Sequence, residues 1–348
     1  MKPEIKYMQR CLQLAAFGKG RVAPNPMVGA VIVCRDKVVG EGFHRIYGGA
    51  HAEVNAIESV ADKSLLRDST LYVNLEPCSH YGKTPPCSER IIRERIPQVV
   101  IGHSDPFPDV SGSGIRMLRD AGIEVICNFM RQECEAINKR FITFQTKKRP
   151  YIFLKWAQSG DGFLDHVRTP GDSKQAVTFS NFYTQTAIHK MRAEESAIMV
   201  GTRTVLLDNP FLNVRLWKGN NPLRIAIDKN RTIPPSSHLL DGSSSTIVFT
   251  DKDQPCPNNY IPIDFDRDIL PQILEVLYQR NIQSLIVEGG AHLLGSFIRS
   301  HLWDEAQIEI SNINLKCGIE APSLQGNLVN VQKCENSVIY VYQNGDIP

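Results

Sequence analysis

A group of potential metal ligands constrains this chain more than any other feature. His51-Ala52-Glu53 is followed along the sequence by Pro77-Cys78 and then by Cys87. Zinc binds His nitrogen and Cys sulfur in a tetrahedral shell, and a catalytic zinc keeps one position open for water. The ligand set His51, Cys78 and Cys87, with the carboxylate of Glu53 left free, matches that arrangement. The fold must therefore bring these side chains together.

The same pattern is the signature of zinc deaminases. In them H-x-E precedes P-C and a second Cys, and the Glu acts as general acid and base without binding the metal. Here residues 79–86 separate the two cysteines, so the tight turn of C-x-x-C becomes a loop that could line a pocket. Two alternatives are a closed structural zinc site, with His80 or His44 as fourth ligand, and two unrelated buried thiols, because buried Cys is common and often inert.

An open zinc site of this kind predicts hydrolytic deamination. Zinc lowers the pKa of bound water to ~7, so hydroxide is available at neutral pH. Glu53 would take the water proton and pass protons to the ring nitrogen and to the departing amine. Hydroxide would attack the amino-bearing carbon of a pyrimidine ring, and ammonia would leave.

Composition narrows the class of protein. The chain has 348 residues, which favours two domains or one large domain. A formal net charge of +2 gives no electrostatic argument for nucleic-acid binding, and no run approaches the ~18 apolar residues of a membrane span. Nine Cys without a regular framework favour a reducing compartment and metal or structural roles over disulfides. Because residues 1–6 lack the apolar run of a signal peptide, we expect a cytoplasmic enzyme.

Hydrophobic patterning predicts alternating helices and strands in the first half. Helices are expected where apolar residues recur at helical spacing, and buried strands where they are continuous. The expected helices are 4–17, 51–57, 88–95 and 115–121, and the expected strands are 30–34, 38–42, 71–75, 98–102 and one that starts at 122. Such alternation predicts a mostly parallel or mixed sheet that is covered on both faces.

The end of the first domain is expected where a linking helix over 135–145 runs into the basic, Pro-terminated segment 147–150. We therefore predict a zinc-dependent deaminase domain at 1–147 and a second domain at 148–348. In the second domain, helices are expected over 188–195 and 273–280, and strands over 151–155, 197–201, 223–228, 246–250, 284–287, 305–310 and 337–342.

A Gly-Gly pair in the second domain is placed to bind a dinucleotide phosphate. Glu288-Gly289-Gly290 follows a buried strand. Glycines let backbone N–H groups approach a pyrophosphate, and a helix N-terminus favours the anion. The segment is not G-x-G-x-x-G, so a standard Rossmann fingerprint is not predicted. A simple tight turn is the alternative.

The first half resembles the cytidine-deaminase-like superfamily, and more narrowly the deaminase domain of the bifunctional riboflavin-biosynthesis deaminase/reductase family. The matching residues are Pro24-Asn25-Pro26, Val28-Gly29, Gly40, Gly42, His44, Gly48, His51-Ala52-Glu53-Val54, Glu76-Pro77-Cys78-Ser79-His80, Gly82, Thr84-Pro85-Pro86-Cys87, Asp105-Pro106, Gly112, Gly114-Ile115 and Ala121-Gly122-Ile123. The resemblance implies a three-layer α/β/α fold, one Zn²⁺, and substrate contacts from Asn25, His44, Ser79 and His80. Phe107 replaces the Asn that is usual in the family, at the edge of the pocket.

The second half resembles the reductase domain of the same family, which has a dihydrofolate-reductase-like α/β fold and uses NADPH. The match runs from Lys155 to Ser296 and includes Ala157, Ser159, Asp161-Gly162, Arg192, Ala197-Ile198, Gly201, Thr204-Val205, Asp208, Pro210, Leu212, Arg215 and Glu288-Gly289-Gly290. The resemblance implies cofactor contacts from Ala157, Gln158, Thr204, Asp208, Gly290, Ala291, His292, Leu293, Leu294, Gly295 and Ser296. It implies substrate contacts from Lys155, Arg192, Leu212, Arg215 and Glu288. Two arginines suit a ribose phosphate, because guanidinium groups match phosphate oxygens.

One segment departs from the reductase pattern. The family usually has Ser, then Trp, then Ile-Ser or Ile-Thr, whereas residues 173–180 contain no Trp. Ser173 is the candidate for the substrate-binding Ser, and either Gln175 or Thr178 would take the cofactor position of the Trp. Asn209 replaces a common second Asp, and Thr232 is a candidate near the 2′-phosphate.

Two motif sets in the order of this family predict a bifunctional enzyme of riboflavin biosynthesis. The resemblance implies deamination of 2,5-diamino-6-(5-phosphoribosylamino)pyrimidin-4(3H)-one and NADPH-dependent reduction of its ribosyl group to ribityl. It also implies a homo-oligomer, a dimer or a tetramer. The alternatives are a nucleoside or nucleic-acid zinc deaminase fused to an unrelated or inactive reductase-like domain, and a binding protein with a closed zinc site.

Overall fold

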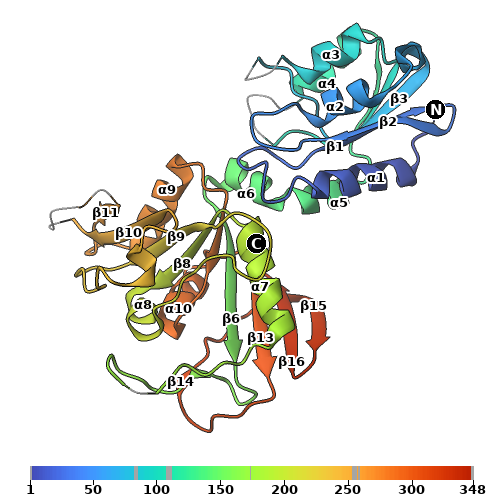
Figure 1. Ribbon diagram of the computed structural model, residues 1–348. Coiled ribbons are helices and arrows are strands. Elements are labelled where there is room, and N and C mark those ends of the chain that lie inside the picture. The colour runs from blue at the N-terminus through green and yellow to red at the C-terminus, as the bar shows by residue number, and fades with distance from the viewer. Residues whose placement is uncertain are drawn as a thin grey trace. The chain divides into compact units, whose positions relative to one another are not determined.

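Two compact units make up the chain, Met1–Lys148 and Arg149–Pro348. The computed structural model describes residues 2–81, 85–106, 112–172, 174–252, 257 and 259–345. Each unit has a β-sheet of its own with helices packed against it (Figure 1). The division between the units falls within the basic segment 147–150. Within the described ranges, no helix is long and apolar enough to cross a membrane.

The first unit contains a mixed five-stranded sheet, as the sequence predicted. In spatial order its strands are β2 (Lys37–Phe43), β1 (Gly29–Cys34), β3 (Ser69–Leu75), β4 (Gln98–His103) and β5 (Glu124–Ile126). β1 is antiparallel to both β2 and β3, whereas β3, β4 and β5 run parallel. The chain therefore leaves the carboxyl end of β3 directly into Pro77-Cys78.

Helices cover both faces of this sheet and give the predicted three-layer fold (Figure 1). α1 (Ile5–Ala16) and α5 (Arg131–Ile137) pack against Val31 and Val33, while α2 (Ala52–Ser59), α3 (Cys87–Arg93) and α4 (Ser113–Asp120) pack against Ala30 and Ile32. Alternate residues of β1 thus point into two separate cores, as pleating requires. This explains why the strand reads as a continuous apolar run.

Close backbone contact fixes α2 against β2. A Cβ atom added to Gly42 would lie 2.3 Å from the backbone N of Ala56 and 2.6 Å from the carbonyl O of Ala52. A side chain at this position would therefore push the helix away. Because the start of α2 carries His51 as N-cap and Glu53 in its first turn, this contact fixes the position of both side chains.

The expectation of one linking helix over 135–145 is wrong. The chain forms α5 and a separate α6 (Lys139–Lys147), which meet at Asn138. The Asn138 side chain accepts a hydrogen bond from the Met27 N–H (2.8 Å) and donates one to the Met27 carbonyl (2.9 Å). Asn favours such side-chain bonds to backbone over a helix interior, so the helix breaks where this residue holds the loop of Asn25.

The second unit is built on a nine-stranded sheet. In spatial order the strands are β11 (Tyr260–Ile263), β10 (Thr246–Asp251), β9 (Leu223–Ile227), β8 (Ala197–Gly201), β12 (Ser284–Val287), β6 (Tyr151–Gln158), β13 (Glu305–Ser311), β16 (Ser337–Gln343) and β15 (Asn327–Cys334). Neighbours from β11 to β13 pair in parallel, and β16 pairs antiparallel with β13 and β15. A short antiparallel pair, β7 (Phe163–Asp165) with β14 (Ile319–Glu320), is separate from this sheet.

Helices again lie on both faces of the larger sheet. The main core packs α9 (Ile269–Gln279) and α10 (Ala291–Arg299) against one face, and a smaller core on the other face includes residues of α7 (Phe182–Glu194) and α8 (Thr202–Asp208). α7 starts earlier than the predicted 188–195, because the Asn181 side chain caps it by accepting from Tyr183 N and Thr184 N. The parallel strands place residues from β6, β8 and β12 along one edge, where ligands bind in open α/β sheets.

Candidate active sites

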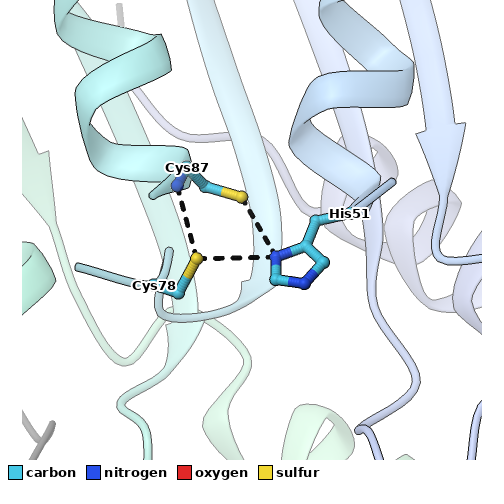
Figure 2. A group of neighbouring side chains, drawn as sticks. All are labelled: His51, Cys78 and Cys87. Atoms are coloured by element: carbon cyan, nitrogen blue, oxygen red, sulfur yellow. Dashed lines mark hydrogen bonds between the residues drawn. The ribbon is translucent and has the colours of Figure 1, made fainter. Parts of the chain in front are cut away.

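Three of the predicted metal ligands converge in the first unit. His51 lies at the start of α2, Cys87 at the start of α3, and Cys78 in the loop after β3 (Figure 2). His51 Nδ1 is 3.3 Å from Cys87 Sγ and 3.5 Å from Cys78 Sγ. The ligand atoms all lie within 4.8 Å of one another. An imidazole and two thiols at this spacing fit a zinc ion, which takes these donors.

Hydrogen bonds already favour the metal-binding form of one thiol. The backbone N–H of Cys87 points at Cys78 Sγ, at 3.3 Å. The pKa of the Cys78 thiol is lowered well below its usual value, chiefly by its hydrogen bond with Cys87 and then by His51. Because the thiolate is the form that binds metals, Cys78 is prepared for a cation. The hydrogen bond with Cys78, and then burial, raise the pKa of the Cys87 thiol.

Glu53 is placed next to this group but is not one of its ligands. Its side chain is 3% exposed, in the first turn of α2. Burial raises the pKa of the Glu53 carboxyl to about 7, and the nearby His51 opposes that shift. A buried carboxyl with a pKa near neutrality can both accept and return a proton, which is what a general acid–base group requires.

His44 supports Asn25 instead of completing a closed metal site. His44 Nδ1 bonds to the Ala50 carbonyl at 3.0 Å, which makes Nδ1 the protonated nitrogen, and Nε2 then accepts from Asn25 Nδ2 at 3.1 Å. Both ring nitrogens are therefore engaged, and the ring meets His51 edge to face, 5.4 Å between centroids. This arrangement orients the Asn25 amide and leaves its carbonyl oxygen to contact a ligand.

The remaining predicted contacts of this site lie after Cys78. Ser79 Oγ is 2.5 Å from Ser113 Oγ at the start of α4, and His80 is exposed. Neither His80 nor His44 belongs to the group of converging metal ligands among the described residues. The departure at Phe107 lies outside the described residues.

A second cluster of charged side chains lies in the other unit, around β6 and the end of β12. Arg192 on α7 donates to Glu288 at 2.9 Å, and Lys155 on β6 is 8% exposed. Burial lowers the pKa of Lys155, and Glu288 opposes that shift. Burial alone would raise the pKa of Glu288, but Arg192 and then Lys155 hold it below its usual value. These three predicted substrate contacts therefore form one charged group.

Arg215 and Leu212 approach the same group from the loop after α8. The backbone N–H of Arg215 donates to His189 Nδ1 at 3.0 Å, and its guanidinium donates to the Asn213 side chain at 2.8 Å. Burial, and then Arg192 and Arg215, lower the pKa of His189 to about 4, so its ring is neutral at pH 7. The Leu212 side chain packs in the smaller core, so only its backbone is left to contact a ligand.

The predicted cofactor contacts surround a turn that requires glycine. Gly289 has φ +123°, and a Cβ there would lie 2.9 Å from Thr204 Oγ1. A Cβ on Gly290 or on Gly201 would meet nothing within 4 Å. Gly290 is the N-cap of α10, whose first N–H groups are free to bind an anion. This open, glycine-bordered helix start fits a dinucleotide phosphate.

Several other residues predicted to contact the cofactor form hydrogen bonds within the protein, and others are buried in the core. Asp208 accepts from Arg168 at 2.5 Å, Thr232 bonds to Asp228 through its N–H and hydroxyl, and Gln158 accepts from Trp156. Along α10, Ala291 and His292 lie in the first turn, and the Ser296 hydroxyl bonds to the His292 carbonyl. Leu293, Leu294 and Gly295 are buried, so any contact from them uses the backbone. Ala157 is half-buried, Gln175 and Thr178 are exposed, and Ser173 lies outside the described residues.

Two family models match the chain, one in each unit. Residues 1–103 match the cytidine and deoxycytidylate deaminase zinc-binding region, and residues 150–315 match the RibD C-terminal domain. The riboflavin biosynthesis protein RibD of Bacillus amyloliquefaciens is 40% identical over 92% of this chain and 87% of its own length. The chain belongs to the RibD family.

Solved structures agree with this placement in the RibD family. A diaminohydroxyphosphoribosylaminopyrimidine deaminase/5-amino-6-(5-phosphoribosylamino)uracil reductase from Thermotoga maritima is 37% identical, with a TM-score of 0.86 over 98% of both chains. RibD from Acinetobacter baumannii is 29% identical, with a TM-score of 0.87 over 98% of both chains. The predicted pairing of a zinc deaminase domain with a reductase domain is thus confirmed, and a second domain unrelated to the reductase is excluded.

The sequence of this RibD family member did not reveal every residue that builds the two sites. Glu76 was part of the recognised motif, but its role was not predicted; its buried carboxylate accepts four backbone hydrogen bonds around the start of α4. Glu309 and His189 were not predicted at all. Glu309 lies in an alternating stretch, Glu305 to Ile310, whose polar residues resemble a solvent-facing edge, so pattern alone gave no signal.

Proposed function

We propose that this chain catalyses two successive steps of riboflavin biosynthesis. Its first unit would deaminate 2,5-diamino-6-(5-phosphoribosylamino)pyrimidin-4(3H)-one, and its second would reduce the ribosyl group of the product to ribityl with NADPH. The observation that carries the proposal is the convergence of His51, Cys78 and Cys87 beside buried Glu53, in a chain that matches RibD relatives over most of its length. The Thermotoga maritima relative is named as a diaminohydroxyphosphoribosylaminopyrimidine deaminase/5-amino-6-(5-phosphoribosylamino)uracil reductase, which supports this choice of substrates.

In the deaminase site, His51, Cys78 and Cys87 would hold one zinc ion. When bound, zinc would supply hydroxide from water near neutral pH. Glu53 removes a proton from the attacking water and returns protons to the ring nitrogen and to the departing amine. The carbon–nitrogen bond to the amine breaks, a carbon–oxygen bond forms, and ammonia leaves with the proton that Glu53 delivered.

Asn25 would orient the pyrimidine for this reaction. Its Nδ2 is already used as donor to His44, at 3.1 Å, so its carbonyl oxygen is the atom that faces a donor on the substrate. An amide held in one orientation discriminates between donors and acceptors on a ring edge, since an unmatched buried polar group is costly. Positioning of this kind also lowers the barrier, because the reacting atoms are held in contact.

In the reductase site, NADPH would supply the hydride, with its pyrophosphate at the start of α10. The open space beside Gly290 and the φ of Gly289 support that placement. Lys155, Arg192 and Arg215 are the cations near the site that suit the anionic phosphoribosyl group. Glu288 is held by Arg192 and would accept hydrogen bonds from sugar hydroxyls.

A coupled assay tests both halves of the proposal. Zinc-loaded protein would receive the diaminopyrimidine substrate with and without NADPH, while ammonia and nicotinamide absorbance are followed. We expect Glu53→Gln to lose ammonia release by roughly 10²–10⁴-fold and to keep reducing supplied deaminated substrate. We expect Glu288→Gln to show the reverse. Glu89→Gln and Glu305→Gln, on exposed or remote carboxylates, are the matched controls. No ammonia from the unmodified protein would refute the proposal.

We also propose that the enzyme is a cytoplasmic homo-oligomer that associates through its second unit. β15 is an edge strand whose residues are mostly exposed, and Leu328, Val329 and Val331 are each about half exposed. An apolar edge of this kind is normally covered. Light scattering should give a mass above 39.0 kDa, and Val331→Lys should reduce it. A monomeric unmodified protein would refute this part.

The described cysteines form no disulfide, which suits a reducing compartment.

A further inference from the structure

A buried carboxylate lies on β13, the strand next to the β6 strand that carries Lys155. Glu309, on β13, is 1% exposed. Its Oε2 accepts a hydrogen bond from the Ser180 hydroxyl at 2.6 Å, whereas Oε1 is buried and has no hydrogen-bond partner among the described residues. A buried carboxylate oxygen without a partner is costly. Such a group calls for an explanation in terms of function.

Strand register places Glu309 beside Lys155. β13 and β12 are the two neighbours of β6. Glu309 is the registered partner of Ala157 on β6, two residues beyond Lys155 and therefore on the same face of the sheet. On the other side, Val287 pairs with Leu154, so Glu288 follows next to Lys155. The ammonium thus has a carboxylate on each neighbouring strand.

The charge of Lys155 must be compensated on its own face of β6, because the opposite face is apolar. Ile152, Leu154 and Trp156 point into the main core, while Lys155 stands on the other face beneath α7. Burial lowers the pKa of Lys155; Glu288 and then Glu309 oppose that shift, and Arg192 on α7 adds to it. His189 on α7, whose ring is neutral at pH 7, and the Arg215 guanidinium lie around Glu288 and Arg192. Neither compensates the charge of the Lys155 ammonium.

We propose that Glu309 is a positioning residue of the reductase site, which acts with Glu288 from opposite strands to keep the Lys155 side chain charged and in place. Ser180 holds the Glu309 carboxylate in one orientation. A cationic Lys155 is what an anionic phosphoribosyl substrate would meet. The use of a charged Lys155 for substrate binding rests on the proposed reductase function. The placement of Glu309, Lys155 and Glu288 on three neighbouring strands comes from strand register alone.

Trace labelling of amines measures the charge of Lys155 without any catalytic step. Protein would be treated with a trace of labelled acetic anhydride over a range of pH, and the peptide that carries Lys155 quantified by mass spectrometry. Only the unprotonated amine reacts. The variants are Glu309→Gln, which keeps the shape but removes the charge, and Glu288→Gln as the positive control. Glu305→Gln is the matched control, because its carboxylate lies on the same strand and face, two positions to the other side of Lys155 in register. That carboxylate accepts from the Tyr151 hydroxyl and is not among the charges that act on Lys155.

We expect the half-labelling pH of Lys155 to fall in Glu309→Gln, to fall further in Glu288→Gln, and to stay unchanged in Glu305→Gln. At a fixed pH below the midpoint, labelling should rise several-fold in Glu309→Gln. A Glu309→Gln curve that overlies that of the unmodified protein would overturn the inference. Should Glu309→Gln fail to fold, Ser180→Ala, which only frees the carboxylate, should shift the curve in the same direction by less, and no shift there would also overturn it.

Reductase kinetics then connect the charge to turnover. The alkaline limb of the kcat/KM profile should move to lower pH in Glu309→Gln, and Glu309→Asp should recover part of the displacement, which a packing defect would not do. If the alkaline limb stays at the same pH in Glu309→Gln, the link between the charge of Lys155 and reductase turnover is overturned. Unmodified protein that oxidises no NADPH but shows the labelling shift would refute the proposed reductase function and still support the carboxylate pairing. The two failures are therefore distinguishable.

Discussion

Replacement of Glu76 by Gln should destabilise the first unit far more than a surface substitution does. The Glu76 carboxylate is 6% exposed and accepts four backbone hydrogen bonds, from the N–H groups of Asp105 (3.1 Å), Gly112 (3.1 Å), Gly114 (3.0 Å) and Ile115 (3.2 Å). Each oxygen accepts two of them. The carboxylate therefore satisfies N–H groups at the start of α4, where a negative charge is also favoured by the helix dipole.

The magnitude follows from the atoms that the substitution changes. Gln keeps one acceptor oxygen and turns the other into an NH₂ group, which faces two N–H donors. Two hydrogen bonds to a charged acceptor are then lost, and each contributes about 1.5–3 kcal/mol. Because the donor residues Asp105 and Gly112 are only partly buried, we expect the lower end of the sum, about 3 kcal/mol of unfolding free energy.

Urea unfolding of the full chain, followed by circular dichroism, measures this loss. The two units can unfold in separate transitions, so the transition of the first unit is the one to compare. Glu89→Gln, in the first turn of α3, is the matched control, because its carboxylate bonds to Tyr81 at the surface and should change stability by less than ~0.5 kcal/mol. A Glu76→Gln protein as stable as this control would refute the reasoning.

Three further predictions concern the sites. Gly42→Ala should cost about 1–3 kcal/mol and reduce ammonia release, because the new Cβ would overlap α2; an unchanged urea midpoint would contradict this. Zinc removal by a chelator should abolish ammonia release and leave NADPH oxidation on deaminated substrate intact, and loss of both activities would argue against separate sites. The His189 pKa is lowered to about 4, so the unfolded chain binds more protons than the folded chain between pH 6.5 and 4. The unfolding free energy therefore decreases as the pH is lowered from 6.5 to 4. That fall should be smaller in His189→Asn, and equal slopes would exclude the effect.

The zinc ligands could be predicted from the sequence because their chemistry restricts the residue types. His51, Cys78 and Cys87 have few alternative roles once they occur in this order with Glu53, and the strands and helices between them have clear periodicity. Alternating elements likewise predicted the mixed sheet of the first unit. The helix break at Asn138 was missed, since a single Asn within a helical pattern signals no break until its distant partner, Met27, is known.

Residues that act through strand register were beyond sequence reasoning. Glu309 lies on the same face as Lys155, two positions away in register, only because β13 lies beside β6 in a sheet whose order is not the order of the chain. The edge strand β15 was missed for a related reason: its residues are mostly exposed, so it lacks the apolar signal of a buried strand. The substrate contact of His44 stays a prediction, whereas its hydrogen bond with Asn25 was not predicted from the sequence.

The hydrogen bonds between Asn138 and Met27 determine the shortest fragment of the first unit that can keep its pocket. The zinc-binding match ends at residue 103, but the loop that carries Asn25 is fastened by a side chain from the far end of the unit. Cys134 of α5 also fills the core beside Tyr72 and Val100. A gene fragment that stops soon after the last zinc ligand would keep the metal and lose the shape of the pocket. Any shortened form of this domain, natural or engineered, must therefore include the chain at least as far as Asn138.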